Sequence, residues 1–167
     1  MDMSFTVTKR GFLGGASATL GALLLGAGCG TEAAAETFEV TRSEEQWRRL
    51  LTPAQYRVLR DEGTERAGSS PLNQEHRPGA YLCGGCNLPV YRAQDKFESG
   101  TGWPSFVRPI QGNVRTRPDN TLLTTRTEAH CRRCGSHLGH VFEDGPAPTG
   151  QRWCMNGVAM RFAPARA

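Results

Sequence analysis

Lysine is nearly absent from this chain of 167 residues, in which arginine supplies almost all of the positive charge. The formal net charge is only +4 at neutral pH, and the arginines are spread along the chain instead of forming a block. So weak an excess of positive charge gives no reason to expect a nucleic-acid partner. No internal repeat is visible either, so the length corresponds to one ordinary domain plus some additional chain.

A long, strongly apolar run of the kind that crosses a membrane is also lacking. The nearest approach is residues 11–28, a segment rich in glycine, alanine and leucine that follows Lys9 and Arg10. It is too short and too weakly apolar for a convincing membrane span, but it is typical of a signal peptide. We therefore expect residues 1–28 to direct export, to the periplasm or to the outer side of the cytoplasmic membrane.

Two patterns within the export segment concern its route and its cleavage. Residues 8–13 resemble a twin-arginine signal in which lysine replaces the first arginine. Residues 25–29 resemble a lipoprotein cleavage site, where Cys29 would become a lipid anchor. The alternative is cleavage after residues 33–35, which would discard Cys29 with the signal peptide.

The folded domain is expected to begin near Ser43. Residues 29–42 are small, polar and acidic without periodicity, which is typical of a flexible tether. We expect the catalytic domain to cover residues 43–164.

Two short helices are predicted at the start of this domain. The segment 43–46, SEEQ, is a capping box, and Trp47 follows at helical spacing. Thr52 then precedes Pro53, a combination that predicts a second helix over residues 53–62 with Gly63 as its stop.

The remainder of the domain has the pattern of β structure. Short runs rich in valine, leucine, threonine and aromatics are separated by glycine, proline and asparagine. The expected strands cover residues 80–83, 88–91, 103–107, 114–117, 122–128, 138–142 and 153–162. We therefore expect a mainly β fold, with twisted antiparallel sheets or a barrel-like core and two or three short N-terminal helices outside.

Four of the six cysteines form two Cys-x-x-Cys pairs, Cys83 with Cys86 and Cys131 with Cys134. Two such turns offer four thiolates that complete a closed tetrahedral site, which is typical of structural Zn²⁺. Two redox motifs or two disulfides are the alternatives, but the doubled metal-ligand spacing favours zinc. The 44 residues between the pairs exceed the span of a zinc ribbon, so the metal is expected to clamp distant β segments.

Cys154 is the thiol that remains once four cysteines are assigned to the metal and Cys29 to the export segment. Strand alternation would place Arg152, Cys154 and Asn156 on one face. A nearby guanidinium favours the thiolate, and the Asn156 amide is suited to orienting a substrate or an imidazole. Cys154 is therefore a candidate nucleophile, and a buried core cysteine is the alternative.

Three more side chains are candidates for the same site. His137 and His140 can transfer protons near neutral pH, although a regular strand would point them to opposite faces. A bulge at Gly139 would bring them to one side. Trp103 lies in a turn-forming frame of glycine and proline, where it is either an aromatic plate for a substrate or simply part of the core.

From about residue 44 to residue 162 the chain resembles the methionine sulfoxide reductase B family, the peptide-methionine (R)-S-oxide reductases. The matching segments, in order, are LTPAQYRVLR at 51–60, the two cysteine pairs, GTGWPSF at 100–106, HLGHVF at 137–142, DGP at 144–146 and RWCMNG at 152–157. The resemblance implies a twisted all-β core with a structural zinc and the thiol-dependent reduction of methionine (R)-S-oxide in peptides, which would repair oxidised proteins.

The resemblance also implies a role for each candidate. Cys154 would attack the sulfoxide sulfur and become a sulfenic acid, while His137 or His140 assists the oxygen. Arg152 and Asn156 would tune the thiolate and hold the pocket. Trp103 and Phe142 would bind the substrate.

One position departs from many members of the family, because Thr101 stands where they have a resolving cysteine. We therefore expect the sulfenic acid to be reduced directly by an outside thiol, such as a thioredoxin-like protein, and we expect the enzyme to act as a monomer. Two rival classes remain at this point. One is a zinc enzyme of similar β architecture, such as the glutathione-dependent formaldehyde-activating type, and the other is a non-catalytic zinc-clamped binding module.

Overall fold

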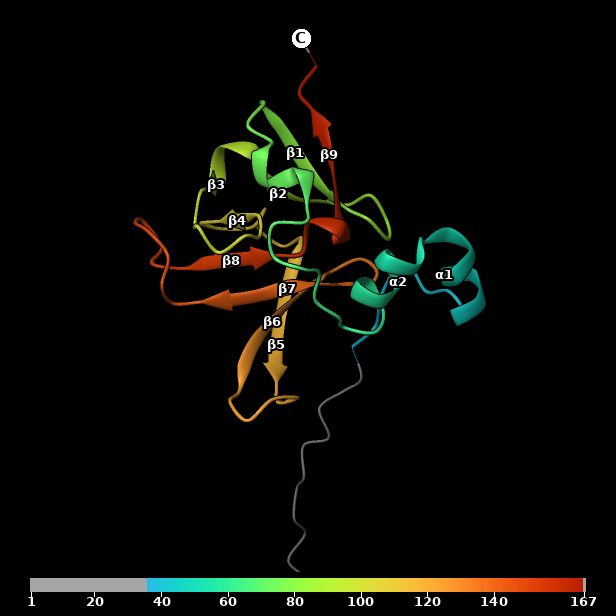
Figure 1. Cartoon of the computed structure of the whole chain (residues 1–167). Helices are drawn as coiled ribbons and strands as arrows, with labels where there is room; N and C mark the ends of the chain where they lie inside the picture. The colour runs from blue at the N-terminus through green and yellow to red at the C-terminus, as the bar shows by residue number, and fades with distance from the viewer. Residues whose placement is uncertain (1–35, 167) are drawn as a thin grey trace, which may run out of the picture. The chain divides into compact units, whose positions relative to one another are not determined.

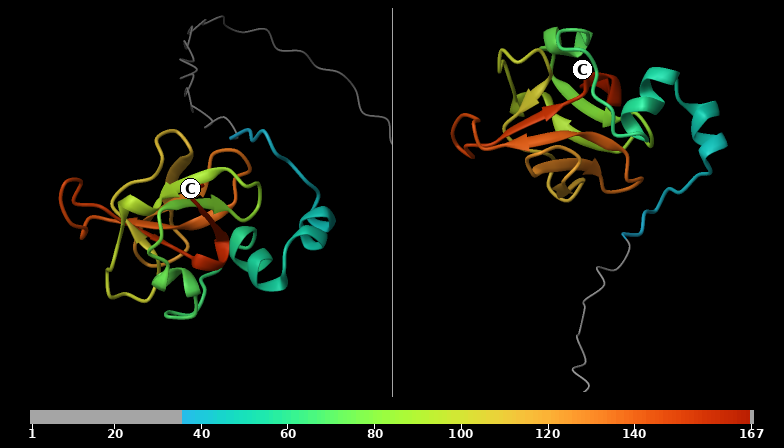
Figure 2. Two further views of the ribbon diagram at one scale, coloured as in Figure 1. Left: turned by 90° about the horizontal axis from the view of Figure 1, so that it is seen from above. Right: turned by 60° about the horizontal axis from the view of Figure 1, so that its bottom comes forward.

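The computed structural model describes residues 36–166, which form two antiparallel β-sheets with two short helices to one side (Figures 1 and 2). The predicted signal peptide and the first residues of the predicted tether lie outside the described residues. Among residues 36–166, none of the helices has the length and apolar character needed to cross a membrane.

Both predicted helices are present, and both begin with a capping box. In α1 (Glu44–Leu50) the Ser43 hydroxyl accepts from the Gln46 N–H, while the Gln46 side chain accepts from the Ser43 N–H. Thr52 caps α2 (Pro53–Leu59) in the same way. Helix α2 is shorter than the predicted 53–62, because the backbone reverses at Glu62, where φ is 54°.

The strands form two separate sheets. The first sheet has the order β2–β1–β9 and the second has the order β3–β4–β8–β7–β6–β5, and every pairing is antiparallel. The bounds are β1 (Gly79–Cys83), β2 (Pro89–Arg92), β3 (Lys96–Phe97), β4 (Ser105–Phe106), β5 (Val114–Asp119), β6 (Arg126–Cys131), β7 (His137–Phe142), β8 (Arg152–Met155) and β9 (Met160–Pro164). The mainly β prediction is confirmed, although the sheets do not close into a barrel.

Three predicted strands are wrong in their bounds. The expected strand 103–107 is reduced to β4 (Ser105–Phe106), because Trp103 lies in a bend before it. The expected strand 153–162 is divided into β8 and β9, which belong to different sheets and are joined by the 3₁₀ turn η3 (Gly157–Ala159). The side chain of Glu65 accepts hydrogen bonds from the backbone at the start of this turn, and no local sequence pattern encodes that long-range contact. The expected strand 122–128 begins only at Arg126, since residues 120–125 form the hairpin loop.

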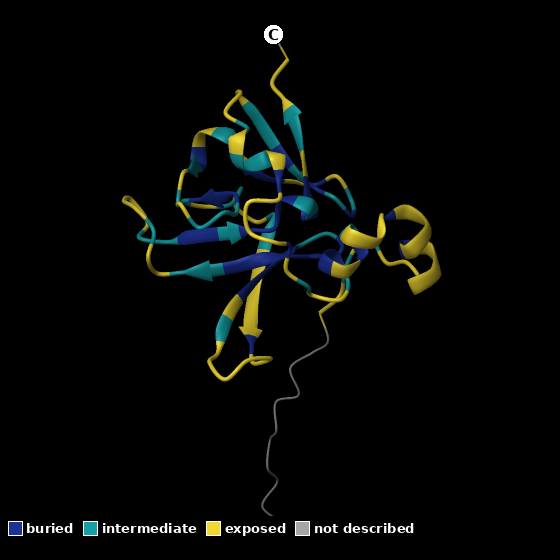
Figure 3. Ribbon diagram, viewed as in Figure 1, coloured by how far each residue is buried: buried dark blue, intermediate teal, exposed yellow. Residues whose placement is uncertain are grey.

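A buried core connects the sheets and the helices. Tyr91 and Phe106 stack with ring centroids 4.3 Å apart, and both are fully buried. Leu59 of α2 and Trp47 of α1 join the same core. Burial of each such side chain contributes about 1.5–3 kcal/mol to stability. Figure 3 shows that the buried residues run along the central part of β7 and β8, so the strands that carry the candidate site are among the best-packed segments.

Candidate functional site

The four cysteines of the two pairs converge. Their Sγ atoms all lie within 4.8 Å of one another, with 3.7 Å between Cys83 and Cys134 and 3.5 Å between Cys86 and Cys131. Sulfurs at the corners of a tetrahedral zinc site with Zn–S bonds of about 2.3 Å would be about 3.8 Å apart. The observed spacings fit a single bound metal ion, and they are far longer than a disulfide bond of about 2 Å.

This cluster ties the two sheets together. Cys83 ends β1 in the first sheet, and Cys131 ends β6 in the second. Gly85 is needed between the first pair, because a Cβ there would lie 2.7 Å from the Ser136 Oγ and close to the Cys134 sulfur. The expectation that the metal clamps distant β segments therefore agrees with the strand order.

Cys154 lies on β8 at the wall of a second site. Strand β8 pairs Cys154 with Ser105 of β4 on one side and with His140 of β7 on the other. A cavity of about 160 Å³ opens beside the thiol. It is lined by Thr64, Trp103, Arg126, Gly139, His140, Phe142, Cys154 and Asn156. Five of the candidates singled out from the sequence thus share one cavity.

The two remaining candidates, Arg152 and His137, lie next to the cavity without lining it. The Arg152 guanidinium donates to both carboxylate oxygens of Asp144 at 2.8 Å. Its Cζ atom lies 4.4 Å from the centroid of the Phe142 ring. The ion pair holds the guanidinium over this ring. Its charge then acts on the thiol two residues along the strand.

Opposing influences act on the Cys154 thiol. Burial raises the pKa of Cys154 above its usual value, while the charge of Arg152 and hydrogen bonds from Thr101 and Ser105 oppose the rise. The Ser99 hydroxyl links those two residues, at 2.9 Å from Thr101 Oγ1 and 2.8 Å from Ser105 Oγ. The thiol is therefore protonated at neutral pH, and its neighbours are arranged to favour the thiolate when the proton leaves.

An irregularity in β7 brings the two histidines together. In the pairing of β6 with β7, Ala129 faces Gly139 while His130 faces His137, so Leu138 has no partner. The bulge lies one residue before the position predicted from Gly139. As a result the rings of His137 and His140 have centroids 5.2 Å apart.

A different carboxylate orients each imidazole. His137 Nδ1 is 2.8 Å from Glu128 Oε1, and His140 Nε2 is 2.8 Å from Asp119 Oδ2. Burial lowers the pKa of His140, and the Asp119 hydrogen bond opposes this only in part. Hydrogen bonds from the hydroxyl and the N–H of Thr121 hold the pKa of Asp119 well below its usual value. His140 is therefore a neutral imidazole near pH 7, beside an ionised carboxylate.

Sequence reasoning missed several residues around this cavity. Asp119 and Glu128, the carboxylates that orient the histidines, were not candidates, and neither was Arg126, which lines the cavity and pairs with Asp119. The predicted strand 122–128 already contained Arg126 and Glu128 on one face, but their roles depend on contacts with His137 and Asp119 that only the pairing of β5, β6 and β7 creates. Nothing in the local sequence marks Asp119, because its partner His140 lies 21 residues away.

The fold and the cysteine cluster define a mainly β protein whose two sheets are joined at a metal-binding site. The model of the SelR domain matches residues 51–164. The chain is 52% identical over 124 residues to the peptide methionine sulfoxide reductase MsrB of Methanosarcina barkeri, covering 74% of this chain and 87% of that protein. It is 49% identical over 124 residues to that of Thiobacillus denitrificans, covering 74% and 94%. The chain therefore belongs to the methionine sulfoxide reductase B family of oxidoreductases, as its motifs indicated.

Proposed function

We propose that this protein reduces peptide-bound methionine (R)-S-oxide to methionine, with Cys154 as the nucleophile. The observation that carries the proposal is the shared cavity, in which the Cys154 thiol lies beside His140, Asn156 and Trp103. A sulfoxide sulfur is a poor electrophile until its oxygen accepts a proton or a hydrogen bond, so a thiol and a proton carrier must act side by side.

The chemical step balances with these groups alone. The Cys154 sulfur attacks the sulfoxide sulfur as its proton passes through His140 to the sulfoxide oxygen. The sulfur–sulfur bond formed by this attack and the S–O bond of the substrate then break as the hydroxyl transfers to the Cys154 sulfur, so that Cys154 becomes a sulfenic acid and methionine leaves. The substrate sulfur thereby gains two electrons and the Cys154 sulfur loses two.

The cavity walls account for recognition of the side chain. Trp103 and Phe142 offer apolar faces to the thioether and its methyl group, while the Asn156 amide orients the polar part of the site. Preference for peptide-bound substrate is part of the proposal, because the named relatives are peptide methionine sulfoxide reductases. Preference for the R epimer is also part of it and rests on the family resemblance of the motifs.

Recycling of the enzyme requires an outside thiol. Among residues 36–166, the cysteines other than Cys154 form the metal cluster. A thioredoxin-like dithiol would attack the sulfenic acid, release water and leave carrying the disulfide. An intramolecular disulfide to Cys154 in the oxidised protein, detected by mass spectrometry, would contradict this single-thiol cycle.

The metal in the four-cysteine cluster is proposed to be one structural Zn²⁺ per chain. The sulfur spacing fits tetrahedral coordination, and among residues 36–166 the cluster contains cysteines alone, which suits a closed site that does not bind substrate. The zinc would stabilise the junction of the sheets, and the protein would act as a monomer.

Export is also part of the proposal and rests on the sequence of residues 1–29 alone. The mature protein would be periplasmic, or held at the outer side of the cytoplasmic membrane through lipid on Cys29. Growth with a radiolabelled fatty acid tests the anchor. Label should enter the wild-type chain and not Cys29→Ser, whereas an unlabelled wild-type chain would refute lipidation.

The central experiment compares wild type with Cys154→Ser on peptides carrying either sulfoxide epimer. Wild type should reduce the R epimer with a dithiol reductant, and the variant should lose that activity while keeping its metal and its circular dichroism spectrum. A variant that still reduces the R epimer would disprove the proposal. A wild-type protein that is folded, metal-loaded and inactive on both epimers would instead favour a binding module.

A further inference from the structure

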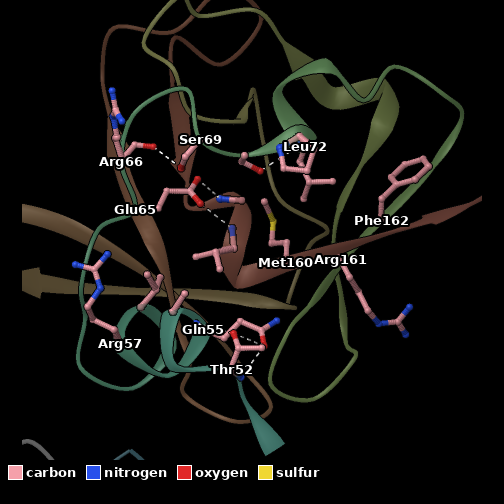
Figure 4. A pocket seen from close by; sticks show the side chains of 16 residues that line it. Thr52, Gln55, Arg57, Glu65, Arg66, Ser69, Leu72, Met160, Arg161 and Phe162 are labelled. Carbon is pink, nitrogen blue, oxygen red and sulfur yellow. Dashed lines mark hydrogen bonds between the residues drawn. The ribbon is translucent and has the colours of Figure 1, made fainter.

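Glu65 is a buried acidic residue that the proposed mechanism does not use. It lies in the segment between α2 and the 3₁₀ turn η1 (Pro71–Gln74), and only 8% of it is exposed. Its carboxyl oxygens accept hydrogen bonds from the backbone N–H groups of Gly157, at 2.6 Å, and Val158, at 2.9 Å. Figure 4 shows the Glu65 side chain directed at these two nitrogens, at the start of η3.

The backbone of the same residue contacts two walls of the substrate cavity. The Glu65 N–H donates to Oδ1 of Asn156 at 2.9 Å. The Glu65 carbonyl oxygen accepts from the indole Nε1 of Trp103 at 3.2 Å. Glu65 is thus hydrogen-bonded both to the amide and to the indole that line the site.

The side-chain contacts of Glu65 with η3 support its backbone contacts with the cavity residues. Asn156 immediately precedes Gly157, so an anchor on the N–H of Gly157 fixes the point from which the Asn156 side chain projects. The Asn156 amide is then fully oriented, because its Nδ2 also donates to the Leu138 carbonyl oxygen at 3.1 Å. The same anchor holds the Glu65 backbone in place, and with it the acceptor for Trp103.

The Glu65 carboxyl group borders open space as well as η3. Glu65 and its partners Gly157 and Val158 line a second cavity, of about 620 Å³, whose other walls come mainly from α2, η1 and β9 (Figure 4). This space would let the segment shift if the hydrogen bonds to η3 were lost. The carboxyl group is therefore a restraint that acts together with the backbone hydrogen bonds to keep Glu65 against the substrate cavity.

We infer that Glu65 is a positioning residue, whose contacts with η3 set the relative position and orientation of Trp103 and Asn156 in the wall of the substrate cavity. This inference rests on the proposed reductase function. Glu65 itself does not line the cavity, so it acts through those two residues. A shift of about 1 Å in a positioning group can cost about 100-fold in rate.

Two variants of Glu65 should weaken its hydrogen bonds to η3 to different degrees. Glu65→Gln keeps one acceptor oxygen for η3, and Glu65→Ala keeps none. We expect kcat/KM on the R-sulfoxide peptide to fall about 10-fold in the first and about 100-fold in the second. Glu45→Gln, which alters an exposed carboxylate on α1, is the matched control and should leave kcat/KM unchanged.

A second readout separates positioning from general damage to the fold. The neighbours that act on the Cys154 thiol are Arg152, Thr101 and Ser105, and Glu65 is not among them. The rate of Cys154 alkylation in the absence of substrate should therefore stay within about twofold of wild type while turnover falls. Equal losses of alkylation and turnover would overturn the inference.

Two further measurements test the inference, and the second of them does not depend on activity. In the double variant Trp103→Phe, Asn156→Ala, adding Glu65→Gln should cost less than about twofold, because the residues through which Glu65 acts are gone. A further loss as large as in wild type would refute the inference. Hydrogen exchange of the Trp103 indole N–H, followed by NMR, should accelerate in Glu65→Gln even if the wild-type protein reduces no sulfoxide. An unchanged exchange rate would also refute it.

Discussion

His137 and His140 lie with their ring centroids 5.2 Å apart, although a regular strand would direct them to opposite faces. Leu138 is the unpaired residue that makes this possible, and each ring is then held by its own carboxylate. Of the two, His140 lines the cavity beside Cys154, whereas His137 is buried behind it with no hydrogen-bond partner on Nε2 among the described residues. The proposed mechanism therefore assigns the two histidines unequal parts in proton transfer.

Replacement of the histidines should reveal this inequality. His140→Asn should lower kcat about 100- to 1,000-fold, because the proton then lacks a carrier between Cys154 and the sulfoxide oxygen. His137→Asn should lower kcat less, since His137 does not line the cavity and would act only through the ring of His140. Single-turnover formation of the sulfenic acid measures the step directly. A greater loss in His137→Asn would show that the proton takes the other route.

Removal of the Arg152 charge should make the thiol less reactive. The guanidinium lowers the pKa of Cys154, so Arg152→Met should raise this pKa further above its usual value. At a fixed pH below the pKa, the thiolate fraction falls about tenfold for each unit of that rise. Iodoacetamide alkylation of Cys154 at pH 8 should slow accordingly. Arg161→Met on β9, whose guanidinium contacts Asn87 instead, is the control and should alkylate at the wild-type rate.

Acid should destabilise the folded protein. The pKa of His140 is lowered by burial, and Glu128 also ends below its usual pKa, because hydrogen bonds from His137 and Arg117 outweigh its burial. The folded state thus binds fewer protons than the unfolded chain. The associated stability is present in full above the unfolded histidine pKa of about 6.5 and is lost as the pH falls through the folded values.

Thermal unfolding at a series of pH values from neutral to mildly acid tests whether stability falls as the pH falls. The midpoint temperature should fall with the pH, and His140→Asn should show a weaker dependence in the upper part of the range. A midpoint that rises as the pH falls would contradict the assigned pKa directions.

Loss of one metal ligand should affect stability far more than loss of the reactive thiol. Cys86→Ser removes a sulfur from the cluster that joins the sheets and should cost more than about 4 kcal/mol, with loss of bound metal. Cys154→Ser, the matched change outside the cluster, should keep its metal and unfold near the wild-type temperature. Elemental analysis and thermal unfolding of both variants provide the comparison. Equal metal contents would show that the cluster does not hold the ion.

Features encoded by neighbouring residues could be predicted from the sequence. The capping boxes at Ser43 and Thr52 depend on contacts three residues apart, and both helices start where the sequence indicated. The paired cysteine spacing likewise predicted the cluster that the structure forms. The end of α2 was less predictable, since it depends on the backbone reversal at Glu62.

The sequence by itself determined the family, the mainly β character, the metal-binding cysteines and the separate status of Cys154, because these follow from ordered motifs and local spacing. Only the tertiary structure decided where the strand after Cys154 breaks, which carboxylate holds each histidine, and that Trp103 and Asn156 are both hydrogen-bonded to the backbone of Glu65. The contact from Glu65 to Asn156 spans 91 residues of chain, and that from Asp119 to His140 spans 21. Hydrogen bonds over such separations depend on sheet register and on the packing of loops, which local sequence patterns do not specify.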